Sequence, residues 1–151
     1  MAISAAEPAM DRCRPPTSLL YAVKQVELAV RAHLDELLKP ARITALQYTA
    51  LTVLERHDGL SAAELARRSF VTAQSMADMI RTLEARKLIR RERNQQNRRE
   101  LQIFLTGEGR QLLADYVGPV TELEHRMVQG LTPRQTRELR RALTAARRAL
   151  S

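Results

Sequence analysis

The chain has 151 residues, and its 44% hydrophobic content makes it too apolar to be wholly disordered and long enough to bury one sizeable core. Aromatic residues make up only 3% and tryptophan is absent, which argues against a β-sandwich or a carbohydrate-stacking surface and favours a helical core rich in Leu and Ala. The formal net charge of +8 is typical of a protein that meets a polyanion.

The N-terminal segment, residues 1–16, is expected to form a flexible leader, because it lacks the apolar run of a signal peptide. No apolar run in the sequence approaches the roughly 20 residues that a membrane span needs. We therefore expect a cytoplasmic protein with no membrane partner. Cys13 is the only cysteine, which excludes an internal disulfide and a cysteine-based metal site.

A long amphipathic helix is predicted after Pro15 and Pro16, with Thr17 as its N-cap and its end before Pro40. Apolar residues recur along it at alternating steps of four and three, at Leu19, Val23, Val26, Val30, Leu34 and Leu37. Tyr21 and Leu38 widen this stripe beyond what a small domain readily covers. We interpret the stripe as partly intermolecular.

A second helix is predicted to begin at Thr44 as its N-cap and to end before a turn at Asp58-Gly59. Its inward-pointing residues are expected to be Leu46, Ala50, Val53 and Leu54. Ser61 and Glu64 then match the S-x-x-E capping box at the start of a short third helix.

A fourth helix is predicted from Thr72 to Arg86, after an interruption at Phe70-Val71. Its buried face is expected to carry Met76, Met79, Ile80 and Leu83. Two helices separated by a few residues, the second freshly capped, have the outline of a helix-turn-helix.

The hydrophobic period then changes to two, which predicts a β-hairpin with Asn94-Gln95-Gln96-Asn97 at its tip. Leu101, Ile103 and Leu105 are expected to point inward. Between residues 86 and 99, seven basic side chains face a single acid, Glu92: Arg86, Lys87, Arg90, Arg91, Arg93, Arg98 and Arg99. These charges repel one another in water, whereas a nearby phosphate backbone would turn the repulsion into attraction. A solvated hairpin without a partner is the alternative.

Two further helices are predicted. The first follows Gly107-Glu108-Gly109 and ends at Gly130, with a kink near Pro119 and an apolar stripe of Leu112, Tyr116, Val120, Leu123 and Met127. The second begins with Thr132 as cap, a proline and a capping-box glutamine, and turns Leu139, Leu143 and Leu150 inward. The predicted fold is therefore mainly α, an α+β winged helix in the order helix, helix, winged helix-turn-helix, helix, helix.

The run from Leu60 to Gly109 contains LSAAELARR, VT-x-x-SM, LEAR-x-LI and RR-x(5)-LT in this order. With these motifs the chain closely resembles the MarR-type family of bacterial winged-helix transcriptional regulators, over residues 17–150 as a single domain. The resemblance implies an obligate homodimer with dimerisation helices in residues 17–43 and 108–150 and a DNA-binding lobe in residues 44–107. It also implies binding to a pseudo-palindromic operator in double-stranded DNA, usually repression, and often release by a small aromatic or phenolic effector, an oxidant or a metal.

The sequence departs from the family pattern at two positions. Asn97 stands where the wing commonly has an Asp that clamps the Arg at the position of Arg99, so we expect a looser and more positive wing. Lys87 replaces the usual glycine after the recognition helix, so it must adopt a left-handed conformation or end the helix differently. Neither change is expected to prevent DNA binding.

The predicted DNA-binding residues are Ser61, Thr72, Gln74, Ser75, Ala77, Asp78, Arg81, Thr82, Arg91, Asn97, Arg98 and Arg99. Gln74 can pair bidentately with adenine, and Ala77 and Thr82 can touch a thymine methyl. Thr72 and Ser75 can bind phosphate near the helix N-terminus. Arg98 and Arg99 are placed to enter a narrow A/T-rich minor groove.

Asp78 is unexpected on this face, because phosphates repel a carboxylate. It could accept a hydrogen bond from a cytosine amine, or it could pair with Arg81 or Thr82 along the helix, which we favour.

An effector pocket is expected where the dimerisation helices meet the lobe, with His33, Tyr48, Met76 and Tyr116 as its lining, although ordinary core packing would explain these residues equally well. The three histidines, His33, His57 and His125, have no metal-ligand spacing, so no metal or other cofactor is expected. Cys13 lies before the position of the reactive cysteine in one-cysteine peroxide sensors of the family, where this chain has Thr17, so we expect an inert thiol.

The main alternative is a winged-helix interaction module that binds RNA or an acidic protein. The long terminal stripes favour the dimeric regulator, because reading two successive grooves needs a dimer and an adaptor does not. An enzyme is not expected, because the sequence has no Ser/His/Asp set, paired-carboxylate pattern, phosphate loop or glycine-rich fingerprint.

Overall fold

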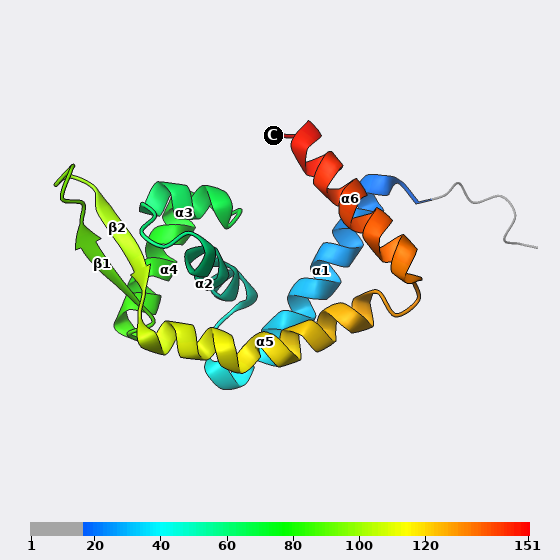
Figure 1. The fold of residues 1–151 in the computed structure, drawn as a ribbon, viewed down its shortest axis with the longest axis horizontal. Coiled ribbons are helices and arrows are strands. Elements are labelled where there is room, and N and C mark those ends of the chain that lie inside the picture. Colours follow the sequence, from blue (N-terminus) through cyan, green and yellow to red (C-terminus); the bar gives the residue numbers. More distant parts are fainter. Residues whose placement is uncertain (1–16) are drawn as a thin grey trace, which may run out of the picture.

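The computed structural model describes residues 17–151; Cys13 and the predicted leader lie outside the described residues. The elements follow in the order α1 (Leu19–Leu38), the 3-10 helix η1 (Lys39–Ala41), α2 (Ala45–Arg56), α3 (Ala62–Arg68), α4 (Ala73–Ala85), β1 (Ile89–Arg93), β2 (Leu101–Leu105), α5 (Gly107–Met127) and α6 (Pro133–Ala149) (Figure 1). This order confirms the predicted mainly helical, winged-helix fold. Within residues 17–151 no helix is long and apolar enough to cross a membrane.

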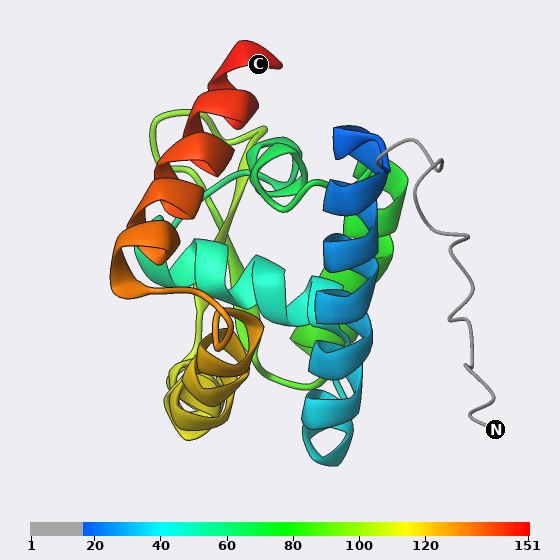
Figure 2. The same cartoon turned by 90° about the vertical axis from the view of Figure 1, so that its right-hand side faces the viewer.

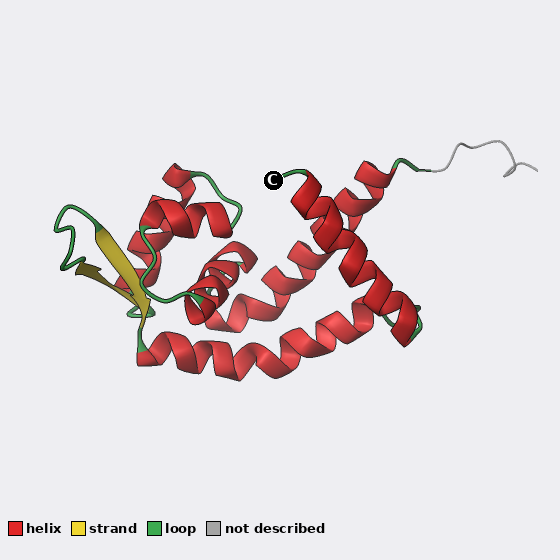
Figure 3. Cartoon of the chain, turned by 45° about the horizontal axis from the view of Figure 1, so that its top comes forward, coloured by secondary structure: helices red, strands yellow, loops and turns green. Residues whose placement is uncertain are grey.

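The elements form two parts (Figure 1). Helices α2, α3 and α4 with the β1–β2 hairpin make a lobe, and α1, α5 and α6 make an arm that extends from it. Helix α5 begins at the foot of the hairpin, packs against α2, β2 and α1, and leads to α6 at the far end of the arm. In Figure 3 the hairpin is the only sheet of the described chain, and it projects from the lobe as a wing.

One hydrophobic core lies in the lobe and continues into the roots of the arm. Its largest completely buried side chains come from α1, α2, α3, α4, both strands and α5: Leu38, Leu51, Leu54, Leu65, Met76, Leu83, Ile89, Ile103 and Leu113. Burying each such side chain contributes about 1.5–3 kcal/mol. Because Leu38 and Leu113 are part of this core, the ends of α1 and α5 nearest the lobe are held by it.

The predicted helix starts are largely correct. Thr44 and Thr132 cap α2 and α6 in complete capping boxes, and Thr72 caps α4 with its hydroxyl accepting from the Ser75 N–H at 3.1 Å. The Ser61 hydroxyl accepts from the Glu64 N–H, but the reciprocal bond of the predicted box is absent from the described contacts. The N-cap of α1 is Ser18 rather than Thr17, because the Ser18 hydroxyl accepts from the Tyr21 N–H at 3.2 Å.

Two helices of the lobe end in left-handed residues that are not glycine. Lys87 follows α4 with a φ of 59°, which is one of the two outcomes predicted for it. The Leu88 N–H donates to the Leu83 carbonyl at 3.0 Å, as in a Schellman motif. Phe70, with a φ of 60°, ends α3 by the same device, which the sequence did not predict.

Phe70→Gly is expected to raise the free energy of unfolding by about 1 kcal/mol, because a left-handed conformation costs a bulky residue more than glycine. The Phe70 side chain is 80% exposed, so its removal sacrifices little packing. Urea unfolding should show the gain for Phe70→Gly and a smaller one for Phe70→Ala, which keeps a Cβ. Equal midpoints for the two variants would contradict this explanation.

The hairpin is confirmed, but its loop is longer than the predicted four-residue tip. The strands pair antiparallel from Ile89–Leu105 to Arg93–Leu101, so residues 94–100 form the loop. The Asn94 N–H donates to the Glu100 carbonyl at 2.9 Å, and this bond closes the loop next to the ends of the two strands. Leu101, expected to point inward, is 42% exposed, because the core does not reach the outer end of the wing.

Two predicted apolar faces are only partly correct. Leu46 is exposed, whereas Tyr48 and Leu51 of α2 face the core. In α5, Leu112, Tyr116 and Val120 of the predicted stripe pack against the core, and Leu113, outside the stripe, is more deeply buried. Helix α5 contains Pro119 and ends at Met127, three residues before the predicted Gly130. These positions depend on which neighbours each helix meets, which its own periodicity does not specify.

The outer arm has no buried side chains in this single chain. Leu139 and Leu143 of α6 and its C-cap residue Leu150 are exposed, as are Val23 and Val26 of α1, so the inward orientation predicted for these leucines is wrong within one chain. Helix α6 crosses α1 in the view of Figure 1 but stands apart from it in Figure 2. The outer parts of the predicted apolar stripes are therefore left exposed within the described chain.

Candidate nucleic-acid interface

Helix α4 presents the predicted polar face to solvent. The exposed residues include Thr72, Gln74, Ser75, Ala77, Asp78, Arg81 and Thr82, while Met76, Ile80 and Leu83 are buried on the opposite face. This burial fixes the rotation of the helix, since the apolar face must remain in the core. The seven side chains are thus held on one rigid surface.

Asp78 pairs with Arg81 one turn later on the same helix. The Thr82 hydroxyl donates instead to the Asp78 backbone carbonyl at 3.1 Å. The favoured pairing with Arg81 is therefore present, and it reduces the repulsion that the carboxylate would exert on a phosphate.

Arg91, predicted to contact DNA, is held against the recognition helix. Its Nε and Nη2 donate to the two carboxylate oxygens of Glu84 at 2.9 and 2.7 Å, a bidentate pair between β1 and α4. These bonds lower the pKa of Glu84, so the pair stays ionised at neutral pH. The structure thus gives Arg91 a role in joining wing to helix, which spacing alone did not reveal.

Arg90 is also engaged, on the other face of the hairpin. It pairs with Glu92, and its guanidinium carbon lies 4.7 Å from the centre of the Phe104 ring. Arg90 and Phe104 are cross-strand partners, which brings the cation over the ring. The charges of Arg90 and Arg91 both lie on β1 and not at the tip of the wing.

The tip of the wing carries two exposed cations. Arg98 and Arg99 lie in the loop, are exposed, and form no ion pair among residues 17–151. Asn97 shapes their turn: its side-chain oxygen accepts from the Arg99 N–H at 3.3 Å and its backbone carbonyl accepts from the Glu100 N–H at 3.0 Å. The Asn that replaces the usual Asp therefore still closes the turn, through the backbone of Arg99.

Comparisons with known proteins agree with this arrangement. Residues 43–100 match the sequence profile of the MarR family. The HTH-type transcriptional repressor Rv2887 of Mycobacterium tuberculosis is 32% identical over 123 residues, which cover 82% of this chain and 88% of that protein. The chain belongs to the MarR family.

Solved structures of this family share the fold. Rv2887 in complex with salicylic acid superimposes with a TM-score of 0.71 at 31% identity, over 87% of this chain and 97% of that one. S. aureus MepR in its DNA-binding conformation gives a TM-score of 0.78 at 26% identity, over 89% and 100% of the two chains.

In this MarR-family chain the predicted effector-pocket residues do not line one hollow. Tyr48 and Met76 belong to the buried core, and burial raises the pKa of the Tyr48 phenol. His33 lines a hollow between α1 and α5, and Tyr116 lines a different one between η1, the end of α4 and α5. Within residues 17–151, no three His, Cys, Asp or Glu side chains gather as a metal site would require.

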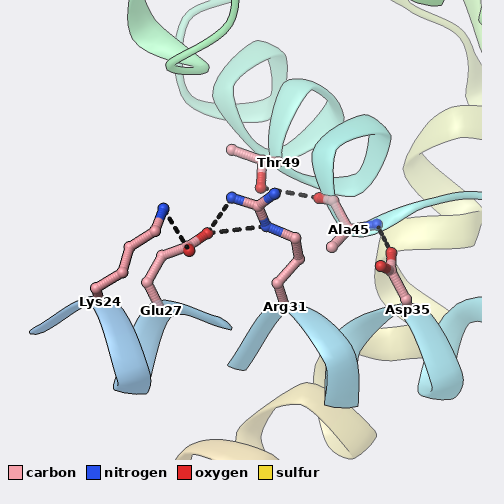
Figure 4. A network of polar contacts seen from close by, with 6 residues as sticks. All are labelled: Lys24, Glu27, Arg31, Asp35, Ala45 and Thr49. Atoms are coloured by element: carbon pink, nitrogen blue, oxygen red, sulfur yellow. Dashed lines mark hydrogen bonds and ion pairs between the residues drawn. The ribbon is translucent and has the colours of Figure 1, made fainter. Parts of the chain in front are cut away.

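The lobe of the MarR-family chain is attached to α1 by a contact that the sequence did not suggest. The Asp35 carboxylate accepts from the Ala45 N–H at 2.6 Å, and the Thr49 hydroxyl donates to the Ala45 carbonyl at 2.9 Å (Figure 4). Earlier on α1, Glu27 pairs with Lys24 and Arg31. Asp35 thus caps the start of α2 from the neighbouring helix.

Proposed function

We propose that this MarR-family protein is a homodimeric, sequence-specific regulator that binds a pseudo-palindromic operator in double-stranded DNA and represses transcription in the cytoplasm. The observation that carries the proposal is the polar face of α4, held beside a wing whose tip carries Arg98 and Arg99. The helix reads base edges in the major groove, and the tip contacts the adjacent backbone or minor groove. These residues bind and none has to react, so we propose no catalytic activity.

The exposed stripes of the arm support the homodimer. Val23 and Val26 of α1 and Leu139 and Leu143 of α6 are apolar residues that remain exposed in one chain. Exposed apolar residues that gather along a helix face favour a protein–protein interface. A second copy would bury the stripes and place two lobes on one duplex, which an RNA-binding or protein-binding adaptor does not require.

An aromatic effector is part of the proposal, because the relative Rv2887 has been solved with salicylic acid. The hollows beside His33 and Tyr116 are two places within residues 17–151 where a small ring could enter. Binding beside Tyr116 would act at the junction of arm and lobe, and binding beside His33 would act within the arm between α1 and α5; either would release the operator.

Selection from a pool of random duplexes tests the proposal. The full-length protein should enrich an inverted repeat with half-sites about 10–10.5 base pairs apart, one turn of the double helix. Light scattering should give the mass of a dimer, and salicylate should lower affinity for the selected duplex. A monomer that enriches no sequence would refute the regulator, and preferential binding to RNA would favour the adaptor.

Gln74→Ala is expected to relax the preference at one base-pair step of each half-site by about 1–3 kcal/mol, the value of a bidentate amide–adenine pair. Affinity should be compared on the selected duplex and on single-base variants of it. Thr82→Ser, which removes only a methyl group from the same face, should relax a different step. An unchanged base preference in Gln74→Ala would remove this residue from the reading set.

A further inference from the structure

A bidentate contact joins the end of the recognition helix to the arm. Arg86, the C-cap residue of α4, donates from Nη1 to the Arg42 carbonyl and from Nη2 to the Ala41 carbonyl, both at 2.6 Å. The acceptors are about 45 positions away in sequence, at the end of η1, which continues directly from α1.

The acceptors suit a cation. Ala41 and Arg42 lie at the C-terminal end of the α1–η1 helical run, where backbone carbonyls lack intrahelical partners and carry partial negative charge. Arg42 has a φ of 57°, and its own N–H donates to the Lys39 carbonyl at 2.9 Å, so the end of the run is turned and fixed. The guanidinium fork therefore caps the helix of the arm with a side chain from α4.

The contact is the polar link between these two parts. Among residues 17–151, the hydrogen bonds between α4, with its C-cap residue, and the α1–η1 run are these two from Arg86. The other side-chain bonds of α4 are internal to the helix or, through Glu84, connect it to the wing. Thus, within residues 17–151, Asp35 bonds the start of α2 to α1, and Arg86 supplies the hydrogen bonds from the recognition helix to the end of the α1–η1 run.

We propose that Arg86 is a positioning residue that sets the separation and orientation of the two recognition helices in the dimer. The inference rests on the proposed function, since the separation exists only when two arms associate. If the arms fix the dimer axis, the angle between α4 and α1 fixes where each α4 meets the groove. By holding this angle, the Arg86 contact makes the protein select the spacing of the half-sites as well as their sequence.

Spacing is the property to measure. Inserting one base pair between the half-sites moves one of them by about 3.4 Å and turns it by about 35° around the axis, given about 10–10.5 base pairs per turn. Wild-type protein, Arg86→Ala and Arg86→Lys should be titrated with the selected inverted repeat and with versions that carry one or two inserted or deleted base pairs. Arg137→Ala, which removes an equal charge from α6 without losing any hydrogen bond among the described contacts, is the matched control.

Arg86→Ala should bind the native spacing on the order of tenfold more weakly, because two charge-assisted hydrogen bonds are lost, and its penalty for one inserted base pair should shrink by a similar factor. Arg86→Lys, which keeps the charge but not the fork, should lie between, and Arg137→Ala should keep the wild-type spacing preference. The inference would be overturned if Arg86→Ala bound every spacing with the same loss of affinity. If Arg86→Ala does not fold, an unchanged spacing preference in Arg86→Lys would overturn it instead. Wild-type protein without any spacing optimum would instead refute the dimeric reader itself.

Discussion

Replacing Gly109 with alanine should lower the free energy of unfolding by roughly 3 kcal/mol, at the upper end of the cost of overpacking a core. A Cβ at Gly109 would lie 2.2 Å from the Leu88 carbonyl oxygen and 3.0 Å from a methyl carbon of Leu105. The first neighbour is backbone at the start of the hairpin, and this same carbonyl accepts the Thr106 N–H at 3.1 Å. Relief of the clash must therefore move α5 away from the wing.

Gly107→Ala is the control for this effect. It lies two residues earlier in the same helix, and a Cβ there would have no heavy atom within 4 Å. Chemical unfolding should show a large loss for Gly109→Ala and little change, or a slight gain from better helix propensity, for Gly107→Ala. Similar losses in both variants would mean that helix initiation, and not the close approach to Leu88, is the sensitive feature.

Arg99→Ala should weaken binding to all duplexes alike, by about 10–100-fold near 0.1 M salt, if each copy of the residue neutralises one phosphate. A dimer carries two copies, so the slope of log affinity against log salt should become shallower by about two units. The side chain is exposed and forms no ion pair within residues 17–151, so its loss should leave the fold intact. Titrations of selected and scrambled duplexes at several salt concentrations measure both quantities.

Arg99→Lys separates charge from shape in this prediction. The lysine keeps the positive charge, so the salt slope should return close to that of the wild type, whereas any preference for a narrow A/T-rich minor groove should weaken. A loss in Arg99→Ala confined to one base position would show that the residue reads sequence and does not contact the backbone.

Local signals account for what the sequence determined by itself. The caps at Thr44, Thr72 and Thr132 were predicted because a hydroxyl and the N–H three residues later are neighbours in any helix start. The helix-turn-helix and the wing follow from changes in hydrophobic period. The left-handed conformation of Lys87 was one of two outcomes predicted because this residue replaces the usual glycine of the family pattern. Each of these signals involves residues within a few positions of one another.

The tertiary structure decided which arginines are available. In the sequence Arg86, Arg90 and Arg91 belong to the same basic cluster as Arg98 and Arg99, and nothing local distinguishes them. In the fold, Glu84 holds Arg91, Phe104 and Glu92 hold Arg90, and carbonyls more than 40 positions away hold Arg86. Arg98 and Arg99 at the tip, like Lys87 after α4, are exposed and form no ion pair within residues 17–151, so their charges stay available to a partner.

The left-handed Phe70 and the buried Leu113 were likewise settled by packing. Phe70 lies in the turn between α3 and α4, and this turn must fit the separation of two helices that share a core, whatever residue it contains. Leu113 is buried because it is on the side of α5 that faces the neighbouring elements. Hydrogen-bond and packing partners are set by distance in space. Helix caps and hydrophobic periods are set by distance along the chain, and for this reason the sequence alone yielded the elements and their order but not the contacts between them.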